Sequence, residues 1–131
     1  MAITSLDDTI VALATPPGEG GIAVIRMSGS DSADIASRLF VTAGMKKVTG
    51  FRDRYFHYGF IADKDGNNVA EVSLVYMKAP RTYTREDVVE IHCHGGMIPI
   101  RKIISLILEE GARMAEPGEF TKRAFLNGRI D

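Results

Sequence analysis

The chain has 131 residues, which is enough for one domain with its own hydrophobic core. Apolar residues make up 45% of it and charged residues 25%, a composition that excludes a disordered low-complexity protein. Its 16 Lys and Arg nearly balance 17 Asp and Glu, and the net charge of -1 argues against RNA binding mainly by phosphate contacts of this chain.

The length of the apolar runs, the first residues and the number of cysteines favour a cytoplasmic protein with no membrane contact. No apolar run reaches the roughly 20 residues that a membrane span requires. The first eight residues lack the basic start and apolar centre of a signal peptide. Cys93 is the only cysteine, which excludes an internal disulfide and fits a reducing compartment.

The first part of the chain predicts two strands followed by a helix. Residues 9–15 and 22–27 are apolar enough for strands. Between them, residues 16–21 must form a loop, because two prolines and three glycines suit neither a helix nor a strand. A helix is expected from residue 30 or 31 to about residue 40, since Ser and Asp are good N-caps.

The middle of the chain predicts a hairpin, a strand and a second helix. Strands are expected at residues 55–62 and 69–77, and the Asp-Gly pair between them is a hairpin signal. Another strand covers residues 87–94. A helix with a regular apolar stripe then runs from about residue 97 to residue 110, and Gly111 ends it.

The element order predicts an α+β domain with a mostly antiparallel sheet and two packed helices. A further helix is expected at about residues 118–127. We assign residues 1–118 to one domain and interpret residues 119–131 as the start of a second, helical domain that continues beyond this sequence.

Glu90 interrupts an apolar strand and is the most informative single residue. The strand period of two separates the side chains into two faces, with Val89, Ile91 and Cys93 on one and Val88, Glu90, His92 and His94 on the other. A carboxylate among apolar residues is costly unless it is paired. Either it forms an ion pair with a buried arginine, or it accepts two parallel hydrogen bonds from the amide and amino edge of a pterin or guanine.

Arg26 closes the apolar run of residues 22–25 and also needs a partner. Two interpretations stay open for it. It forms an internal ion pair, or it binds an anion or an amide at the rim of a cleft.

Two other patterns resemble ligand sites, one for a metal ion and one for a phosphate group, but the details of each argue against such a site. The run His92-Cys93-His94 resembles a metal cluster, but alternation directs Cys93 away from both histidines, so we expect no metal site. The glycines of residues 18–21 precede a strand rather than a helix, so they do not predict a phosphate loop. They suit a close approach by another chain or by a flat ligand.

Three segments together resemble the MnmE (TrmE) family of tRNA modification GTPases. They are, in family order, ATPPGEGGIAVIRMSG at residues 14–29, YTREDVVEIHCHGG at residues 83–96 and AEPGEFTKRAFLNGRID at residues 115–131. The resemblance implies a homodimeric domain similar to the tetrahydrofolate-binding domain of glycine-cleavage T-proteins. It also implies a central helical domain and an inserted GTPase, which would lie outside these residues and use GTP with potassium and magnesium.

The resemblance further implies a role in tRNA modification. Family members act with a flavin- and NADH-using partner, MnmG (GidA), and install a (carboxymethyl)aminomethyl group at carbon 5 of the wobble uridine. The cofactor implied is a tetrahydrofolate derivative, 5-formyl- or 5,10-methylene-tetrahydrofolate. No P-loop pattern G-x-x-x-x-G-K-S/T occurs in the sequence, so no GTP hydrolysis is expected of these residues alone.

By the resemblance, the family's folate-binding positions fall on Arg26, Glu90 and Arg129. Arg129 stands where some members have Lys, and Arg85 stands where many have Gly. No catalytic residue is predicted, because no nucleophile and base are evident together. The rival interpretations are a dimerisation platform without a ligand and a stand-alone enzyme that uses the histidines.

Overall fold

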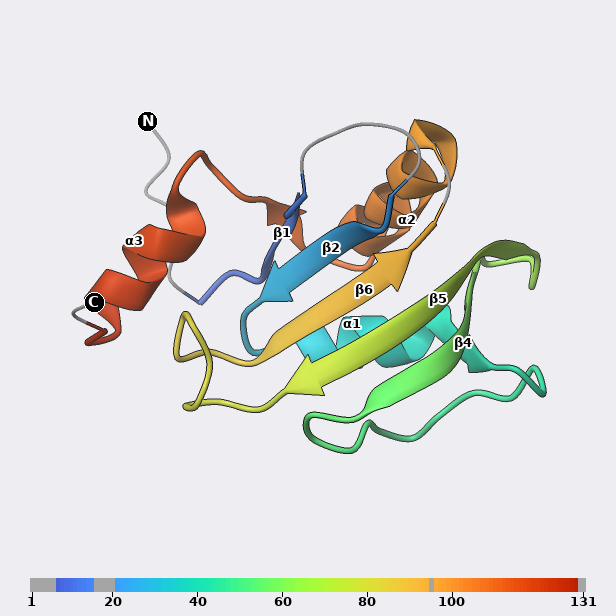
Figure 1. The fold of residues 1–131 in the computed structure, drawn as a ribbon, viewed down its shortest axis with the longest axis horizontal. Helices are drawn as coiled ribbons and strands as arrows, with labels where there is room; N and C mark the ends of the chain where they lie inside the picture. Colours follow the sequence, from blue (N-terminus) through green and yellow to red (C-terminus); the bar gives the residue numbers. More distant parts are fainter. Residues whose placement is uncertain (1–6, 16–20, 95, 130–131) are drawn as a thin grey trace.

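A computed structural model describes residues 7–15, 21–94 and 96–129, and its central feature is one seven-stranded sheet in the order β3-β4-β5-β6-β2-β1-β7. The elements are, in chain order, β1 (Ile10–Leu13), β2 (Ala23–Ser28), α1 (Ser32–Leu39), β3 (Phe40–Thr42), β4 (Phe56–Ala62), β5 (Asn68–Met77), β6 (Val88–Cys93), α2 (Met97–Glu109), β7 (Arg113–Met114) and α3 (Glu119–Leu126). In Figure 1, α1 and α2 lie behind the sheet, whose other face is open, and α3 stands at one end.

The hydrophobic core lies between the sheet and the two helices α1 and α2. On β6, Val89, Ile91 and Cys93 are 0–2% exposed and face this core, as the alternation predicts. Glu90 and His92 lie on the opposite, open face of the same strand. The site residues therefore belong to the uncovered side of the sheet.

The sheet is mixed, which corrects the prediction of a mostly antiparallel sheet. β1 pairs antiparallel with β2, but β7 pairs parallel with β1. The reason is the crossover helix α2, which carries the chain from β6 past β2 and β1 to the sheet edge. A strand that follows such a crossover runs parallel to the strand before it, and β6 itself runs parallel to β1. The α+β class is confirmed, with three helices among the described residues.

Helix α3 is held against the rest of the domain by a buried arginine. Arg123 is 0% exposed, and its Nη1 lies 3.1 Å from Glu86 Oε1 and donates to the Asp8 carbonyl at 2.7 Å. Its Nε donates to Glu119 Oε2 at 3.2 Å, and Glu119 also lies 2.6 Å from Arg113. This network places the end of the chain beside the sheet. The division into residues 1–118 and 119–131 stays a prediction.

None of the helices in the described ranges is both long enough and apolar enough to cross a membrane.

Candidate functional site

Arg26 and Glu90 meet on the open face of the sheet. They are opposite each other in the antiparallel ladder between β2 and β6. Arg26 Nε donates to Glu90 Oε2 at 2.8 Å, and Arg26 Nη2 lies 2.7 Å from the same oxygen. His92 Nε2 lies 3.0 Å from Oε1. An ion pair, one of the two interpretations left open for each residue, is therefore present, but its arginine is 37% exposed rather than buried.

The environment keeps Glu90 ionised. Burial is the largest single influence and raises the pKa of this carboxyl. Hydrogen bonds from His92 and Arg26, together with the charge of Arg26, outweigh burial, so the pKa of Glu90 lies below its usual value. The site thus presents a carboxylate that is 17% exposed, next to a guanidinium that is 37% exposed.

A cavity of about 350 Å³ opens over this ion pair. Its walls combine the pair with apolar and hydroxyl side chains, namely Met77, Thr82, Tyr83, Thr84, Val88 and Phe120. Ligand cavities in proteins begin at about 300 Å³ and carry a few polar groups among apolar ones. The volume and lining of this cavity suit a small planar ligand.

Arg129 lies in a neighbouring cavity of about 620 Å³, not in the one over Glu90. Its Nη1 donates to the Thr82 carbonyl at 3.4 Å, and its guanidinium carbon lies 5.1 Å from the centre of the Tyr83 ring. Met77, Thr82 and Tyr83 line both cavities. The structure therefore brings Arg26 and Glu90 together and separates Arg129 from them by the loop that contains Tyr83.

Residues 80–86 form this loop, and hydrogen bonds hold both of its sides. Ser28 Oγ lies 2.7 Å from Thr84 Oγ1 and donates to Glu86 Oε1 at 2.7 Å. From α3 and its C-terminal end, Tyr83 Oη meets Thr121 Oγ1 at 3.0 Å and Asn127 Nδ2 donates to the Thr84 carbonyl at 2.9 Å. The loop thus depends on β2 and on α3 together.

Arg85 in this loop has a φ of 63°, in the left-handed region that glycine adopts freely. The backbone at this position is therefore left-handed, as it could be with glycine, although the residue is an arginine. Tyr83 and Phe120, which border the cavity, were not singled out by sequence reasoning. Both lie inside the segments that carry the family resemblance, and that position was the one sign in the sequence that they could belong to the site.

A family model described as GTP-binding protein TrmE N-terminus matches residues 9–129. The chain belongs to the TrmE N-terminal family. The family resemblance of the three sequence segments is thereby confirmed.

Named relatives agree with this assignment of the TrmE N-terminal chain. A tRNA modification GTPase MnmE from Alkaliphilus oremlandii is 55% identical over 127 residues, covering 96% of this chain and 28% of that protein. Proteins of the same name from Geobacillus thermodenitrificans and Bacillus subtilis are 54% and 51% identical over 125 residues, covering 95% of this chain and 27% of each. The chain spans little more than a quarter of the length of these curated relatives.

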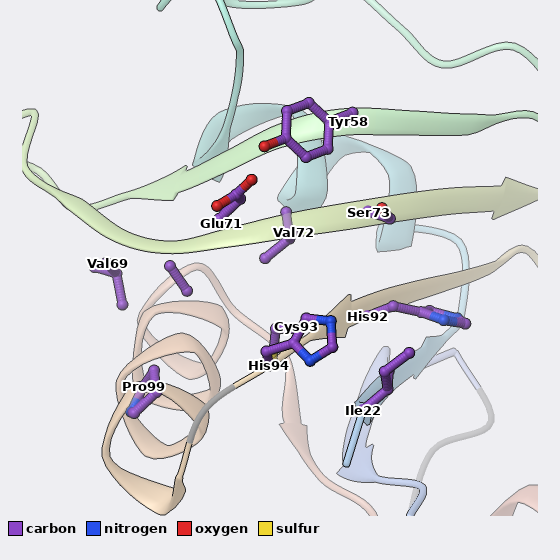
Figure 2. A pocket seen from close by; sticks show the side chains of 11 residues that line it. Ile22, Tyr58, Val69, Glu71, Val72, Ser73, His92, Cys93, His94 and Pro99 are labelled. Atoms are coloured by element: carbon purple, nitrogen blue, oxygen red, sulfur yellow. The ribbon is translucent and has the colours of Figure 1, made fainter. Parts of the chain in front are cut away.

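A third cavity, of about 410 Å³, lies on the open face of the sheet beside β6. Figure 2 shows His92 and His94 on one side of it and Tyr58 and Glu71 on the other. Within the described ranges no three His, Cys, Asp or Glu side chains form a group that could hold a metal ion.

Cys93 is 2% exposed, and burial raises the pKa of its thiol, which makes it a poor nucleophile.

A close approach by another chain or a ligand is predicted for the glycines of residues 18–21. Residues 18–20 lie outside the described residues, and Gly21 has nothing within 4 Å of a Cβ built on it.

Proposed function

We propose that this chain is the reduced-folate-binding and dimer-forming N-terminal part of a tRNA modification GTPase. Its relatives carry that name, and the chain matches about a quarter of their length. In this proposal the fold is of the kind found in the tetrahydrofolate-binding domain of glycine-cleavage T-proteins. GTP hydrolysis with potassium and magnesium, the partner MnmG and the tRNA belong to the larger protein.

The observation that carries the folate proposal is an ionised carboxylate in a cavity of suitable size. Glu90 Oε2 lies within hydrogen-bond distance of both Arg26 Nε and Arg26 Nη2, whereas Oε1 meets His92 Nε2 and retains a further lone pair. In this proposal one donor of a pterin's amide and amino edge binds Oε1, and the other shares Oε2 with Arg26. The guanidinium of Arg26 orients the carboxylate and can donate to the ring carbonyl.

The remaining parts of a folate find matching chemistry close by. Tyr83 and Phe120 offer aromatic surface to the planar portion of the ligand. Arg129, across Tyr83, supplies a positive charge for the anionic end. The cofactor we propose is 5-formyl- or 5,10-methylene-tetrahydrofolate, which supplies a one-carbon unit when bound.

The open face of the sheet supports the dimer proposal. Three large apolar side chains there, those of Ile22, Phe56 and Tyr58, are 55%, 64% and 54% exposed. Exposed apolar patches often mark protein–protein interfaces. Sedimentation equilibrium tests this proposal, and a monomer at high micromolar concentration would contradict it.

Calorimetric titration of the protein with 5-formyl-tetrahydrofolate tests the folate proposal directly. Saturable binding with one folate per chain is expected. A dimer that binds no reduced folate would instead support the rival interpretation, a dimerisation platform without a ligand.

A further inference from the structure

Helix α3 forms part of the wall of the cavity over Glu90. Its Phe120 lines this cavity beside Tyr83, which belongs to the loop of residues 80–86. Glu90 itself lies on β6, so the sheet supplies the floor. In Figure 1, α3 stands beyond the end of the sheet and away from α1 and α2. The cavity therefore combines a floor in the packed sheet with a wall made of a helix and a loop outside it.

The attachment of α3 to the domain is mainly polar. Glu119 and Arg123 are 4% and 0% exposed, and Ala124 is the only apolar one among the buried residues of this helix. The larger apolar side chains of Phe125 and Leu126 are exposed. Elements with few buried apolar contacts open at a lower free energy than elements of a packed core. We therefore expect α3 to detach more readily than α1 and α2, which pack on the core.

Glu86 joins α3 to the loop and to the sheet. Arg123 Nη1 donates to both of its carboxylate oxygens, at 3.1 and 3.2 Å. Ser28 Oγ, at the end of β2, donates to Glu86 Oε1 at 2.7 Å. Arg123 and Ser28 are both 0% exposed, so water screens these contacts little. When α3 detaches, Glu86 loses its cation and the loop loses an anchor.

Two further hydrogen bonds join the helix and its C-terminal end directly to the loop. Tyr83 Oη lies 3.0 Å from Thr121 Oγ1, and Asn127 Nδ2 donates to the Thr84 carbonyl at 2.9 Å. Tyr83 and Thr84 also line the cavity. The same loop residues thus meet α3 on one side and the cavity on the other.

We propose that α3 and the loop of residues 80–86 form a lid over this cavity, which opens as one unit and which a bound ligand holds closed. The proposal rests on the proposed function for the identity of the ligand, a reduced folate. The open lid takes Phe120 and Tyr83 away from the cavity, so the open state binds the ligand more weakly. A ligand that favours the closed state stabilises it, and by the same linkage a change that detaches α3 weakens the ligand's binding.

The first test uses no ligand and disturbs α3 on the side away from the loop. The hydrogen bonds of Arg113 go to Asp8, Met114 and Glu119, none of which belongs to the loop or lines the cavity. Arg113→Gln removes the two bonds that hold Glu119 of α3 to β7. Hydrogen bonds to charged groups are among the stronger ones, so the lid should open about tenfold more often.

Amide hydrogen exchange followed by mass spectrometry measures this opening. In Arg113→Gln, exchange should become about tenfold faster in α3 and in residues 80–86 alike, although the replaced residue contacts only α3. Lys122→Gln, an exposed change on α3, is the matched control and should leave both rates unchanged. Residues 44–50, which follow β3 at the opposite edge of the sheet from β7, should exchange as in wild type in both variants.

The second test adds 5-formyl-tetrahydrofolate to the wild-type protein at about a hundred times its dissociation constant. Exchange through opening of the lid should slow by up to about a hundredfold in α3 and in residues 80–86, because opening then competes with binding. Residues 44–50 again serve as the internal control and should keep their rate.

Each outcome separates the lid from the function on which it rests. Faster exchange of α3 in Arg113→Gln with an unchanged loop shows that the two elements open separately and overturns the lid. Protection by folate that is confined to β2 and β6 also overturns the lid and leaves the folate function intact. Absence of folate binding overturns the proposed function, and the comparison of the unliganded proteins still decides whether α3 and the loop open together.

Discussion

Arg26 Nη2 lies 2.7 Å from Glu90 Oε2, and the two residues are directly opposite each other in the ladder between β2 and β6. A cross-strand pair of opposite charge stabilises the sheet modestly when water reaches it. Arg26 is 37% exposed, so the pair is not a closed internal ion pair. An ion pair that stays open to a cavity can serve the fold and a ligand together.

Replacing Glu90 by Gln should affect binding more than stability. One acceptor oxygen becomes a donor that faces the ligand's own donor, and losing a charge-assisted hydrogen bond costs about 1.5–3 kcal/mol. Folate affinity should fall about ten- to a hundredfold. The free energy of unfolding should fall by about 1 kcal/mol or less, because the pair is partly exposed.

Calorimetric titration and a denaturant melt of the Glu90→Gln variant provide both numbers. Glu71→Gln, an exposed glutamate on the neighbouring strand β5, is the control and should change neither quantity appreciably. A Glu90→Gln protein that is strongly destabilised yet binds folate as wild type does would assign Glu90 a structural role alone.

Replacing Arg123 by Leu should strongly destabilise the protein. Arg123 is 0% exposed, and the change leaves the carboxylates of Glu86 and Glu119 without their shared cation. Removing one partner from a buried ion pair costs about 3–5 kcal/mol. Urea unfolding should show a lower midpoint with an unchanged slope, whereas Lys122→Gln, an exposed change on the same helix, should match wild type. Equal midpoints for all three proteins would refute this role of Arg123.

Acid should weaken the attachment of α3 through Glu119. Hydrogen bonds from Arg113 lower the pKa of Glu119 from its usual 4.5 to about 2, although burial opposes this shift. A carboxyl whose pKa is lower in the folded chain stabilises the fold fully above its unfolded pKa. That contribution, about 3 kcal/mol at most, is lost as the pH falls from about 4.5 to about 2.

The free energy of unfolding, measured against pH for wild type and for Glu119→Gln, checks this expectation. The wild-type curve should fall more steeply below pH 4.5, and the two curves should converge towards pH 2. Parallel curves across this window would show that Glu119 does not couple folding to pH.

Replacing Gly59 by Ala should loosen the edge of the sheet at β3. A Cβ at this position would overlap the Val41 carbonyl oxygen and come within 2.7 Å of the Phe40 ring. Overpacking of this kind costs about 1–3 kcal/mol. Gly66→Ala tests a glycine with open space around it but a φ of 83°, so its cost should come from backbone strain alone. Thermal melts should therefore show destabilisation in both variants, with faster amide exchange at β3 only in Gly59→Ala.

Local patterns sufficed to predict the longer elements. Alternation along β6 correctly separated Val89 and Ile91 from Glu90 and His92, because a strand's two faces follow directly from its period of two. The short strands β3 and β7 were missed, since two or three residues carry no periodic signal. Missing β7 also hid the parallel pairing that makes the sheet mixed.

The sequence by itself determined the family, the main strands and helices, and the residues that deserved attention, because these depend on local composition and on long matching segments. Only the tertiary structure decided that Arg26 meets Glu90, that Arg123 is buried, and that Arg129 lies beyond Tyr83. Those facts depend on the register and packing of segments far apart in the chain. Arg26 and Glu90 are 64 residues apart, and no local rule states which distant side chain will stand opposite a given charge.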